Sequence, residues 1–383
     1  MPDNGSGVAI QLRDLTKRYP GQATAAVDHV NLEIPAGEIV ILVGPSGCGK
    51  TTTMKLINRL IEPTSGEIWI GGEDARRQPA DQLRRHIGYV IQHGGLFPHM
   101  TIADNVAMVP RMLKWPKARI SERVDEMLEL VGLDPAEYRH RFPRQLSGGQ
   151  QQRVGVARAL AADPPVLLMD EPFGAVDPIT RGRLQDELLR LQEELHKTIV
   201  FVTHDFDEAV KLGDRIAVLA EGSRIVQYGE PAEILARPEN DFVRGFIGAG
   251  GAMKLLHVTR IADVELGQGV TVRSDDDAAS VHKRLSDADQ PWAVVLDANK
   301  RPVQWAAIED LVGARGPVKE FGTPIRTTIS GRADLRAGLE ALLGSDTDFV
   351  PVTRRREYVG LVSLNTVRAA IQQLREKAKH ERA

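Results

Sequence analysis

A chain of 383 residues is long enough for two or three domains with ordinary hydrophobic cores. Its 42% hydrophobic and 26% charged residues are typical of a globular protein in water, and a net charge of −3 excludes a nucleic-acid binder that works by bulk electrostatics. The single cysteine, Cys48, excludes an internal disulfide framework and fits a reducing compartment. We expect neither a secretory signal nor a membrane span, because no apolar run reaches about 20 residues, so a membrane role would require another chain.

Alternating strands and helices predict a mainly parallel sheet in the first part of the chain. Short strands are expected within residues 8–43, and the last of them, EIVILV, is a continuous apolar run suited to a strand buried on both faces. Further strands are expected within 65–92, and the pattern from about 100 to 165 is helical. Buried strands PPVLLMDEP and KTIVFVTH follow, and then a hairpin around Glu221 and Gly222.

The texture of the sequence changes after about residue 235. The segment RPENDFVRGFIGAGGAMK is Gly-rich and poorly periodic, which predicts a linker over 241–253. Beyond it, residues 292–311 align without gaps on 348–367, and each copy reads as strand, charged turn, strand and the start of a helix. The upstream segments VTVRSDDDAASVHKRL and TTISGRADLRAGLEALL align at the same offset. Two copies about 56 residues apart predict a paired module, at about 254–313 and 320–375.

The segment GPSGCGKT matches the phosphate-binding loop pattern in full. Its glycines let backbone N–H groups curl around a β-phosphate, at the start of a helix whose dipole favours anions. Lys50 is expected to reach the β- and γ-phosphate oxygens, and the Thr51 hydroxyl to coordinate Mg²⁺. The predicted nucleotide contacts of this loop are Gly44, Ser46, Gly47, Cys48, Gly49, Lys50, Thr51 and Thr52.

Two carboxylates and a histidine follow buried strands. VLLMD ends in Asp170 and is followed at once by Glu171, and parallel strands place such ends at a ligand crevice. We expect Asp170 to hold Mg²⁺ and Glu171 to polarise a water for attack on the γ-phosphate. His204 follows another buried strand, where an imidazole can hydrogen-bond the γ-phosphate. An acidic helix start and a surface histidine are the alternatives, and Tyr19 is either a stacking partner for adenine or a strand-edge tyrosine.

A second Gly-Gly turn, LSGGQ, precedes another helix and offers a second seat for phosphate. The set GPSGCGKT, Gln92, LSGGQ, VLLMDE, Asp177 in GAVD and His204 resembles the ATP-binding subunit of ABC transporters, over about residues 8–240. The resemblance implies a P-loop NTPase of the α/β class with a helical subdomain at about 95–165. It implies that LSGGQ closes over ATP bound at the phosphate loop of a second copy, and that Gln92 senses Mg²⁺ and the attacking water. The implied contacts to that nucleotide are Ser147, Gly148, Gly149, Gln150 and Asp177.

The segments YVIQHGGLFPHMTIADNV and EPFGAVDPITR resemble the osmoprotectant branch of importers, which moves glycine betaine, choline, carnitine or proline-like solutes. The paired C-terminal module resembles tandem cystathionine-β-synthase-type (CBS) domains of α+β fold, which bind adenine nucleotides or sense ionic strength. Their usual ribose pattern, Ser/Thr-x-x-Asp, is split here between Ala307-Ile308-Glu309-Asp310 and Ser363-Leu364-Asn365-Thr366, which leaves nucleotide binding open. The basic turn 354–356 is either a contact for an anionic lipid surface or merely solvated.

The resemblance therefore implies an ATPase that powers import of a compatible solute such as glycine betaine, with ATP and Mg²⁺ as cofactors and regulation by the CBS pair. The implied partners are membrane permease subunits, reached through the segment HGGLFPHMT, a second copy of the chain and, indirectly, a solute-binding protein, without nucleic acid. The implied location is the cytoplasmic face of the inner membrane. The alternatives are import of another solute such as an amino acid, and a nucleotide-sensing regulatory module. A DNA- or ribosome-directed relative usually carries two cassettes or a long coiled coil, and DANKRP lacks the Asn-Lys-x-Asp guanine reader of GTPases.

Overall fold

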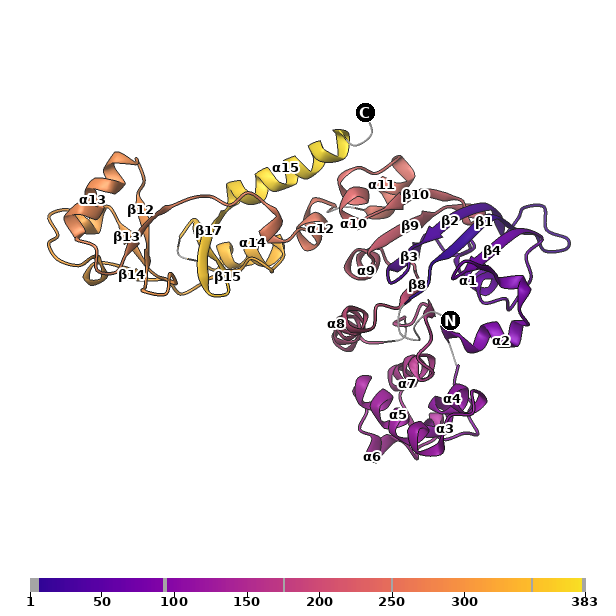
Figure 1. The fold of residues 1–383 in the computed structure, drawn as a ribbon. Helices are drawn as coiled ribbons and strands as arrows, with labels where there is room; N and C mark the ends of the chain where they lie inside the picture. Colours follow the sequence, from indigo (N-terminus) through magenta and orange to yellow (C-terminus); the bar gives the residue numbers. More distant parts are fainter. Residues whose placement is uncertain (1–6, 92–94, 175, 249–250, 346, 381–383) are drawn as a thin grey trace. The chain divides into compact units, whose positions relative to one another are not determined.

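A computed structural model describes residues 7–91, 95–174, 176–248, 251–345 and 347–380 (Figure 1). The chain forms two compact units: residues 1–234 with 238–247, and residues 235–237 with 248–383. None of the helices in the described ranges combines the length and the apolar character that a bilayer crossing requires. Gln92, one of the predicted site residues, lies outside the described residues.

The centre of the first unit is a six-stranded sheet with the order β10-β9-β3-β8-β7-β6. All of its neighbouring pairs are parallel except β10 with β9, which is the predicted hairpin. β3, β7 and β8 are buried at every residue, as their continuous apolar sequences predict. The strands are β3 (Ile39–Val43), β6 (Ile87–Val90), β7 (Val166–Asp170), β8 (Thr198–Thr203), β9 (Arg215–Leu219) and β10 (Ile225–Gly229).

An antiparallel sheet with the order β2-β1-β4-β5 packs on the same core. Leu12 and Ile34 of this sheet share a buried cluster with Leu42 and Val200 of the parallel sheet and with Met54 of α1. The elements are β1 (Ile10–Lys17), β2 (Val27–Ile34), α1 (Lys50–Ile57), β4 (Ser65–Ile70) and β5 (Glu73–Asp74). The strands predicted within 8–43 and 65–92 are therefore confirmed.

The predicted helical subdomain is also present, and Figure 1 shows its helices gathered together. In α5, the buried residues Ile120, Val124, Met127 and Leu128 follow a helical period and form the face that packs on its neighbours. The helices are α3 (Ile102–Val106), α4 (Met108–Met112), α5 (Lys117–Leu130), α6 (Pro135–Tyr138) and α7 (Gly148–Leu160). The remaining helices of the unit are α2 (Ala80–Arg85), α8 (Pro178–Leu195), α9 (Phe206–Leu212), α10 (Pro231–Ala236, which runs into the second unit) and α11 (Asp241–Ile247).

The second unit contains two copies of a strand–helix–strand–strand unit, each with its own buried cluster. The first copy has the sheet β11-β12-β13-β14 with α13 against it, and the second has β15-β16-β17 with α14 (Figure 1). The elements are α12 (Gly251–Val258), β11 (Val270–Arg273), α13 (Ala278–Asp287), β12 (Trp292–Leu296), β13 (Pro302–Ala307), β14 (Thr323–Pro324), β15 (Ile329–Ser330), α14 (Leu335–Leu343), β16 (Phe349–Arg354), β17 (Glu357–Ser363) and α15 (Leu364–His380).

Three expectations for this half of the chain are wrong in detail. The stretch predicted as an irregular linker contains α11 and the start of α12, because Val243 and Ile247 in α11 and Leu255 in α12 are buried, which glycine content does not reveal. The ungapped alignment of the copies is shifted by one residue in the first strand. Trp292 pairs with Ala307, whereas Phe349 pairs with Ser363, so Phe349 takes the place of Trp292. The second hairpin has a turn that is one residue shorter. In the first copy, moreover, a 3₁₀ turn at Glu309–Leu311 replaces the expected helix.

Candidate functional site

The phosphate loop connects β3 to α1 at the carboxyl edge of the parallel sheet, as predicted. The Lys50 ammonium donates to the carbonyl oxygens of Gly44 (2.7 Å) and Pro45 (2.9 Å), so the side chain lies within the curve of the loop. Gly49 has φ +110°, a backbone conformation that side chains rarely adopt. A Cβ at Gly49 would lie under 3.0 Å from the carbonyl oxygen of Ala26, which leaves no room for any other residue.

Ser223 contacts the phosphate loop and the helix that follows it, and sequence reasoning missed this residue. Its N–H donates to the carbonyl of Cys48 (2.6 Å), and its hydroxyl lies 3.0 Å from the Thr53 hydroxyl on α1. Ser223 is fully buried in the turn between β9 and β10. A serine after Glu221 and Gly222 reads in the sequence as an ordinary turn residue, and nothing local indicates that it contacts a loop about 170 residues away.

Thr51 and Asp170 lie together at the same edge. The Thr51 hydroxyl, at the start of α1, donates to Oδ1 of Asp170 at the end of β7 (3.1 Å). Burial raises the pKa of Asp170, and the hydrogen bond from Thr51 opposes that rise. The described residues hold no group of three or more His, Cys, Asp or Glu side chains that could bind a metal by themselves. One hydroxyl and one carboxylate fit Mg²⁺, which commonly takes few protein ligands and completes its shell with phosphate and water.

Glu171 and His204 form the next pair along the edge. Nδ1 of His204 lies 3.1 Å from Oε1 of Glu171, and the Glu171 side chain is 19% exposed against 61% for His204. Glu171 has φ +46°, and its N–H donates to the carbonyl of Val202 on β8 (3.0 Å). The amide of Gln152 on α7 donates to the Glu171 carbonyl (3.2 Å), a contact that the sequence did not predict. The ends of β7 and β8, together with α7, therefore hold Glu171 and His204 in place beside Asp170.

The other predicted nucleotide contacts lie elsewhere on this unit. Ser147 caps α7: its Oγ accepts from the N–H of Gln150 (3.3 Å), and Gln150 Oε1 accepts from the N–H of Ser147 (2.9 Å). Asp177 caps α8, and the hydrogen bond from the Thr180 N–H lowers the pKa of Asp177. Tyr19 is half-buried after β1, with the Lys17 ammonium 5.3 Å from its ring centre. Within the described ranges, no hydrogen bond joins Tyr19, Ser147 or Asp177 to the phosphate loop.

The N-terminus of α7 is open to solvent. Ser147 and Gly148 are exposed, Gly149 is half-buried, and a Cβ at Gly148 would meet nothing within 4 Å. The first N–H groups of a helix that points into solvent can receive an anion. This turn is therefore available to a phosphate that another molecule brings.

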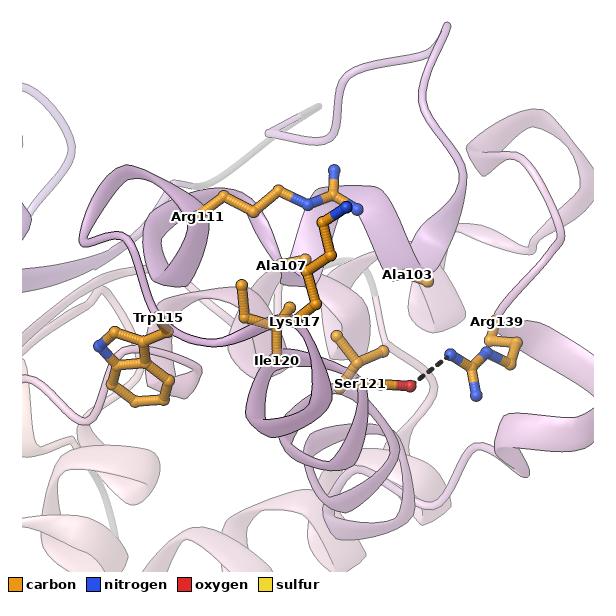
Figure 2. Close-up of a pocket in the computed structure, with 9 residues that line it drawn as sticks. Ala103, Ala107, Arg111, Trp115, Lys117, Ile120, Ser121 and Arg139 are labelled. Carbon is orange, nitrogen blue, oxygen red and sulfur yellow. Dashed lines mark hydrogen bonds between the residues drawn. The ribbon is translucent and has the colours of Figure 1, made fainter.

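A second feature of this unit is a pocket of about 570 Å³ in the helical subdomain (Figure 2). Three of its side chains are basic. Arg111 pairs with Asp104 (2.6 Å), and Arg139 pairs with Asp125 (2.9 Å) and donates to Ser121 (3.2 Å). The lining includes Arg111, Trp115, Lys117, Ile120, Ser121 and Arg139. The pocket combines positive charge with an indole and an aliphatic wall.

The loop ahead of α3 is built around Asn105, another residue that sequence reasoning missed. Asn105 is fully buried, and its Oδ1 accepts from the N–H of Phe97 (2.7 Å). Its Nδ2 lies within hydrogen-bond distance of three carbonyls of the same loop, including that of Thr101 (2.9 Å). The described part of HGGLFPHMT therefore has a fixed internal frame, and Phe97 at its centre is 40% exposed.

A phosphate loop, a hydroxyl–carboxylate pair, a carboxylate–histidine pair and the separate LSGGQ turn are the features expected of a P-loop ATPase of the cassette type. The ABC transporter family profile matches residues 27–174. The osmoprotectant import ATP-binding protein OsmV of Salmonella typhimurium is 48% identical over 347 residues, which covers 90% of this chain and 91% of that protein. The chain belongs to the ATP-binding subunits of ABC transporters.

Two further relatives come from Bacillus subtilis. The choline transport ATP-binding protein OpuBA is 54% identical, and the glycine betaine/carnitine/choline transport ATP-binding protein OpuCA is 45% identical. Each alignment covers 92% of this chain and 94% of the relative. Among solved structures, the dimeric bacterial ABC transporter cassette MJ0796 matches with a TM-score of 0.54 and 38% identity, over 58% of this chain and 98% of that one. The same cassette in a post-hydrolysis state bound to ADP and Pi matches with a TM-score of 0.54 and 37% identity.

Proposed function

We propose that this protein hydrolyses ATP to power uptake of a quaternary-amine osmoprotectant through separate permease subunits, at the cytoplasmic face of the inner membrane. The observation that carries the proposal is the sheet edge that holds the Thr51–Asp170 and Glu171–His204 pairs beside the phosphate loop. The solute class comes from the names of the relatives, which cite osmoprotectants, choline, glycine betaine and carnitine.

In this proposal each pair has its own role in hydrolysis. The phosphates of ATP lie along residues 44–52, where Lys50 offsets negative charge on the β- and γ-phosphates. Thr51 and Asp170 would hold Mg²⁺, with Gln92 as a further ligand, and the bound ion neutralises phosphate charge. Glu171 takes a proton from the attacking water. The oxygen of that water bonds to the γ-phosphorus while the bond between the γ-phosphorus and the β,γ-bridging oxygen breaks, which yields ADP and phosphate. His204 hydrogen-bonds the γ-phosphate, and Tyr19 stacks on adenine.

The open turn at α7 indicates a second copy of the chain. Ser147, Gly148, Gly149 and Gln150 contact the γ-phosphate of ATP seated on the partner's phosphate loop, with Asp177 at the same seam. ATP carries that phosphate and ADP does not, so the nucleotide state controls the association. The dimeric cassette that matches this fold at 38% identity supports the arrangement.

The basic pocket of the helical subdomain is the proposed seat of a permease segment. An amphipathic helix with a carboxylate would place the acid near Lys117 and apolar side chains on Trp115 and Ile120. Lys117→Glu should lower permease binding and permease-stimulated hydrolysis, because like charges then meet. Lys283→Glu, the same charge change on α13 of the second unit, is the matched control. Equal permease affinity in the two variants would remove the pocket from this role.

We also propose the domain assignment 1–240 for the nucleotide-binding domain, 241–253 for the connection and 254–383 for a tandem CBS-type regulatory module. The two similar copies with separate cores support the pairing. The exposed basic turn 354–356 belongs to this module and remains the proposed contact for anionic lipid.

The test of the catalytic proposal is Glu171→Gln. We expect hydrolysis to fall about 10²- to 10⁴-fold, because the general base is lost, while ATP affinity is retained and an ATP-bound dimer accumulates in light scattering. Lys50→Ala should instead lose ATP binding. Glu193→Gln, at an exposed position of α8, is the control and should hydrolyse ATP at the wild-type rate. A wild-type rate in Glu171→Gln would remove Glu171 from the mechanism.

A further inference from the structure

A small pocket of about 70 Å³ in the second unit is walled by aromatic rings. Trp292 begins β12, Trp305 lies on β13 and Phe349 begins β16. The pocket therefore joins the two copies of the repeat. Its other walls are apolar or neutral, and none of the described residues that line it carries a charged side chain. This composition differs sharply from that of the basic pocket in the helical subdomain.

The pocket is built by the packing between the two sheets. Trp305 is 6% exposed and shares a buried cluster with Val294 and Leu361, while Trp292 and Phe349 pack on that cluster and are half-buried. The backbone of Gly267 exchanges two hydrogen bonds with Leu361 (2.9 and 2.8 Å), which brings the segment that follows it against the pocket. The rings are thus held by a fixed frame and remain reachable from solvent.

The lining selects the chemistry of the ligand. The phosphates of a nucleotide would have no cationic partner in this pocket. Ser363, at the ribose position of the repeat, is engaged with the Thr366 hydroxyl (3.1 Å) in the cap of α15, and no carboxylate follows it. A metal ion would find no carboxylate among the lining side chains. A quaternary ammonium is a weakly hydrated cation without hydrogen-bond donors, and aromatic rings attract it through their negative faces.

The pocket is small. A volume of 70 Å³ corresponds to about two water molecules in the liquid, so it would seat N-methyl groups of the ligand against the rings rather than enclose a whole head group. The two copies also differ on their second strands, because the strand pairing places Leu361 of β17 at the position equivalent to Trp305 of β13. Trp292 and Phe349 thus occupy the same position of the two copies, whereas Trp305 has no aromatic counterpart in the second copy.

We propose that this pocket binds the quaternary ammonium head group of an N-methylated amine. The choice of glycine betaine, choline or carnitine as the natural ligand rests on the proposed function, whereas the site itself rests on the aromatic lining. The solute that the permease delivers would then bind directly to the chain that drives its uptake.

Calorimetric titration of the full chain with tetramethylammonium chloride tests the site. Tetramethylammonium, choline and glycine betaine should bind saturably, whereas ethanolamine, the primary amine analogue of choline, should not. Trp292→Leu and Phe349→Leu keep apolar volume and remove one ring each, and each should weaken binding about tenfold, equivalent to about 1.4 kcal/mol. Trp69→Leu, on β4 of the first unit, is the matched control and should bind as the wild type does. Circular dichroism and thermal melting that match the wild type check that each variant is folded.

Three results would overturn the inference: no saturable binding of tetramethylammonium, unchanged affinity in the Trp292→Leu/Phe349→Leu double variant, or displacement of tetramethylammonium by AMP. These failures are separable from failure of the proposed function. Uptake of a quaternary amine without binding to the full chain contradicts only the pocket. Ring-dependent binding without uptake of any quaternary amine contradicts only the proposed function.

Discussion

Replacing Gly49 by alanine tests the packing behind the phosphate loop. The new methyl group would lie under 3.0 Å from the Ala26 carbonyl and the Ser223 hydroxyl, at a φ of +110°. The backbone strain alone costs about 1–2 kcal/mol, and overpacking against a carbonyl adds about 1–3 kcal/mol. Gly72→Ala is the matched control, because Gly72 also has positive φ (+81°) but its Cβ would meet nothing within 4 Å.

The assay is urea unfolding followed by titration with a fluorescent ATP analogue. We expect Gly72→Ala to lower the free energy of unfolding by about 1–2 kcal/mol and to retain ATP affinity. Gly49→Ala should lower it by about 2–5 kcal/mol and lose most ATP affinity, because the loop must move away from Ala26 and Ser223. Equal unfolding midpoints and wild-type ATP affinity in both variants would refute the packing described here.

Three other variants test separate contacts. Asp170→Asn should bind ATP without the Mg²⁺ dependence of the wild type. Without nucleotide, the wild type should lose stability relative to Asp170→Asn as pH rises from the ordinary aspartate pKa to the raised pKa of Asp170, because over that range the folded chain still holds a proton that the unfolded chain has released. Below the ordinary pKa the difference should be smallest, and thermal melting across pH measures it. Asn105→Ala removes the partner of the Phe97 N–H, so permease-stimulated hydrolysis should fall while basal hydrolysis persists; equal loss of both rates would contradict this. Ser223→Ala should lower the free energy of unfolding by about 1 kcal/mol and weaken ATP binding. Unchanged values of both would argue against a stabilising role for the contact between the Ser223 and Thr53 hydroxyls.

The phosphate loop and the strand ends could be predicted because their chemistry is written in adjacent residues. Glycines at fixed spacing before Lys50, and a carboxylate that ends an apolar strand, each specify a local geometry. Ser223, Gln152 and Asn105 could not be predicted in the same way. Each is a common polar residue whose role is defined largely by contacts to backbone groups. The partners of Ser223 and Gln152 lie in other elements, and those of Asn105 depend on the conformation of its own loop.

The C-terminal unit shows a different limit. The repeat is visible in the sequence, but a difference of one residue between two turns does not show in an ungapped alignment. That alignment therefore matches Trp292 with Asp348, whereas the equivalent residue in the second copy is Phe349. The helices α11 and α12 were missed because glycines there suggested irregular structure, whereas burial of Ile247 and Leu255 stabilises helix. The register matters for the aromatic pocket, because it places Phe349, and not Asp348, at the position equivalent to Trp292, and both rings line the pocket.

The central claim is that the Glu171–His204 edge drives solute movement. Vesicles containing the permease together with this subunit, supplied with ATP and labelled glycine betaine, allow hydrolysis and uptake to be measured in one sample. We predict that wild-type vesicles hydrolyse ATP and take up glycine betaine, and that Glu171→Gln lowers both rates in proportion. Uptake at the wild-type rate in Glu171→Gln, or wild-type hydrolysis that moves an amino acid and no quaternary amine, would contradict the account.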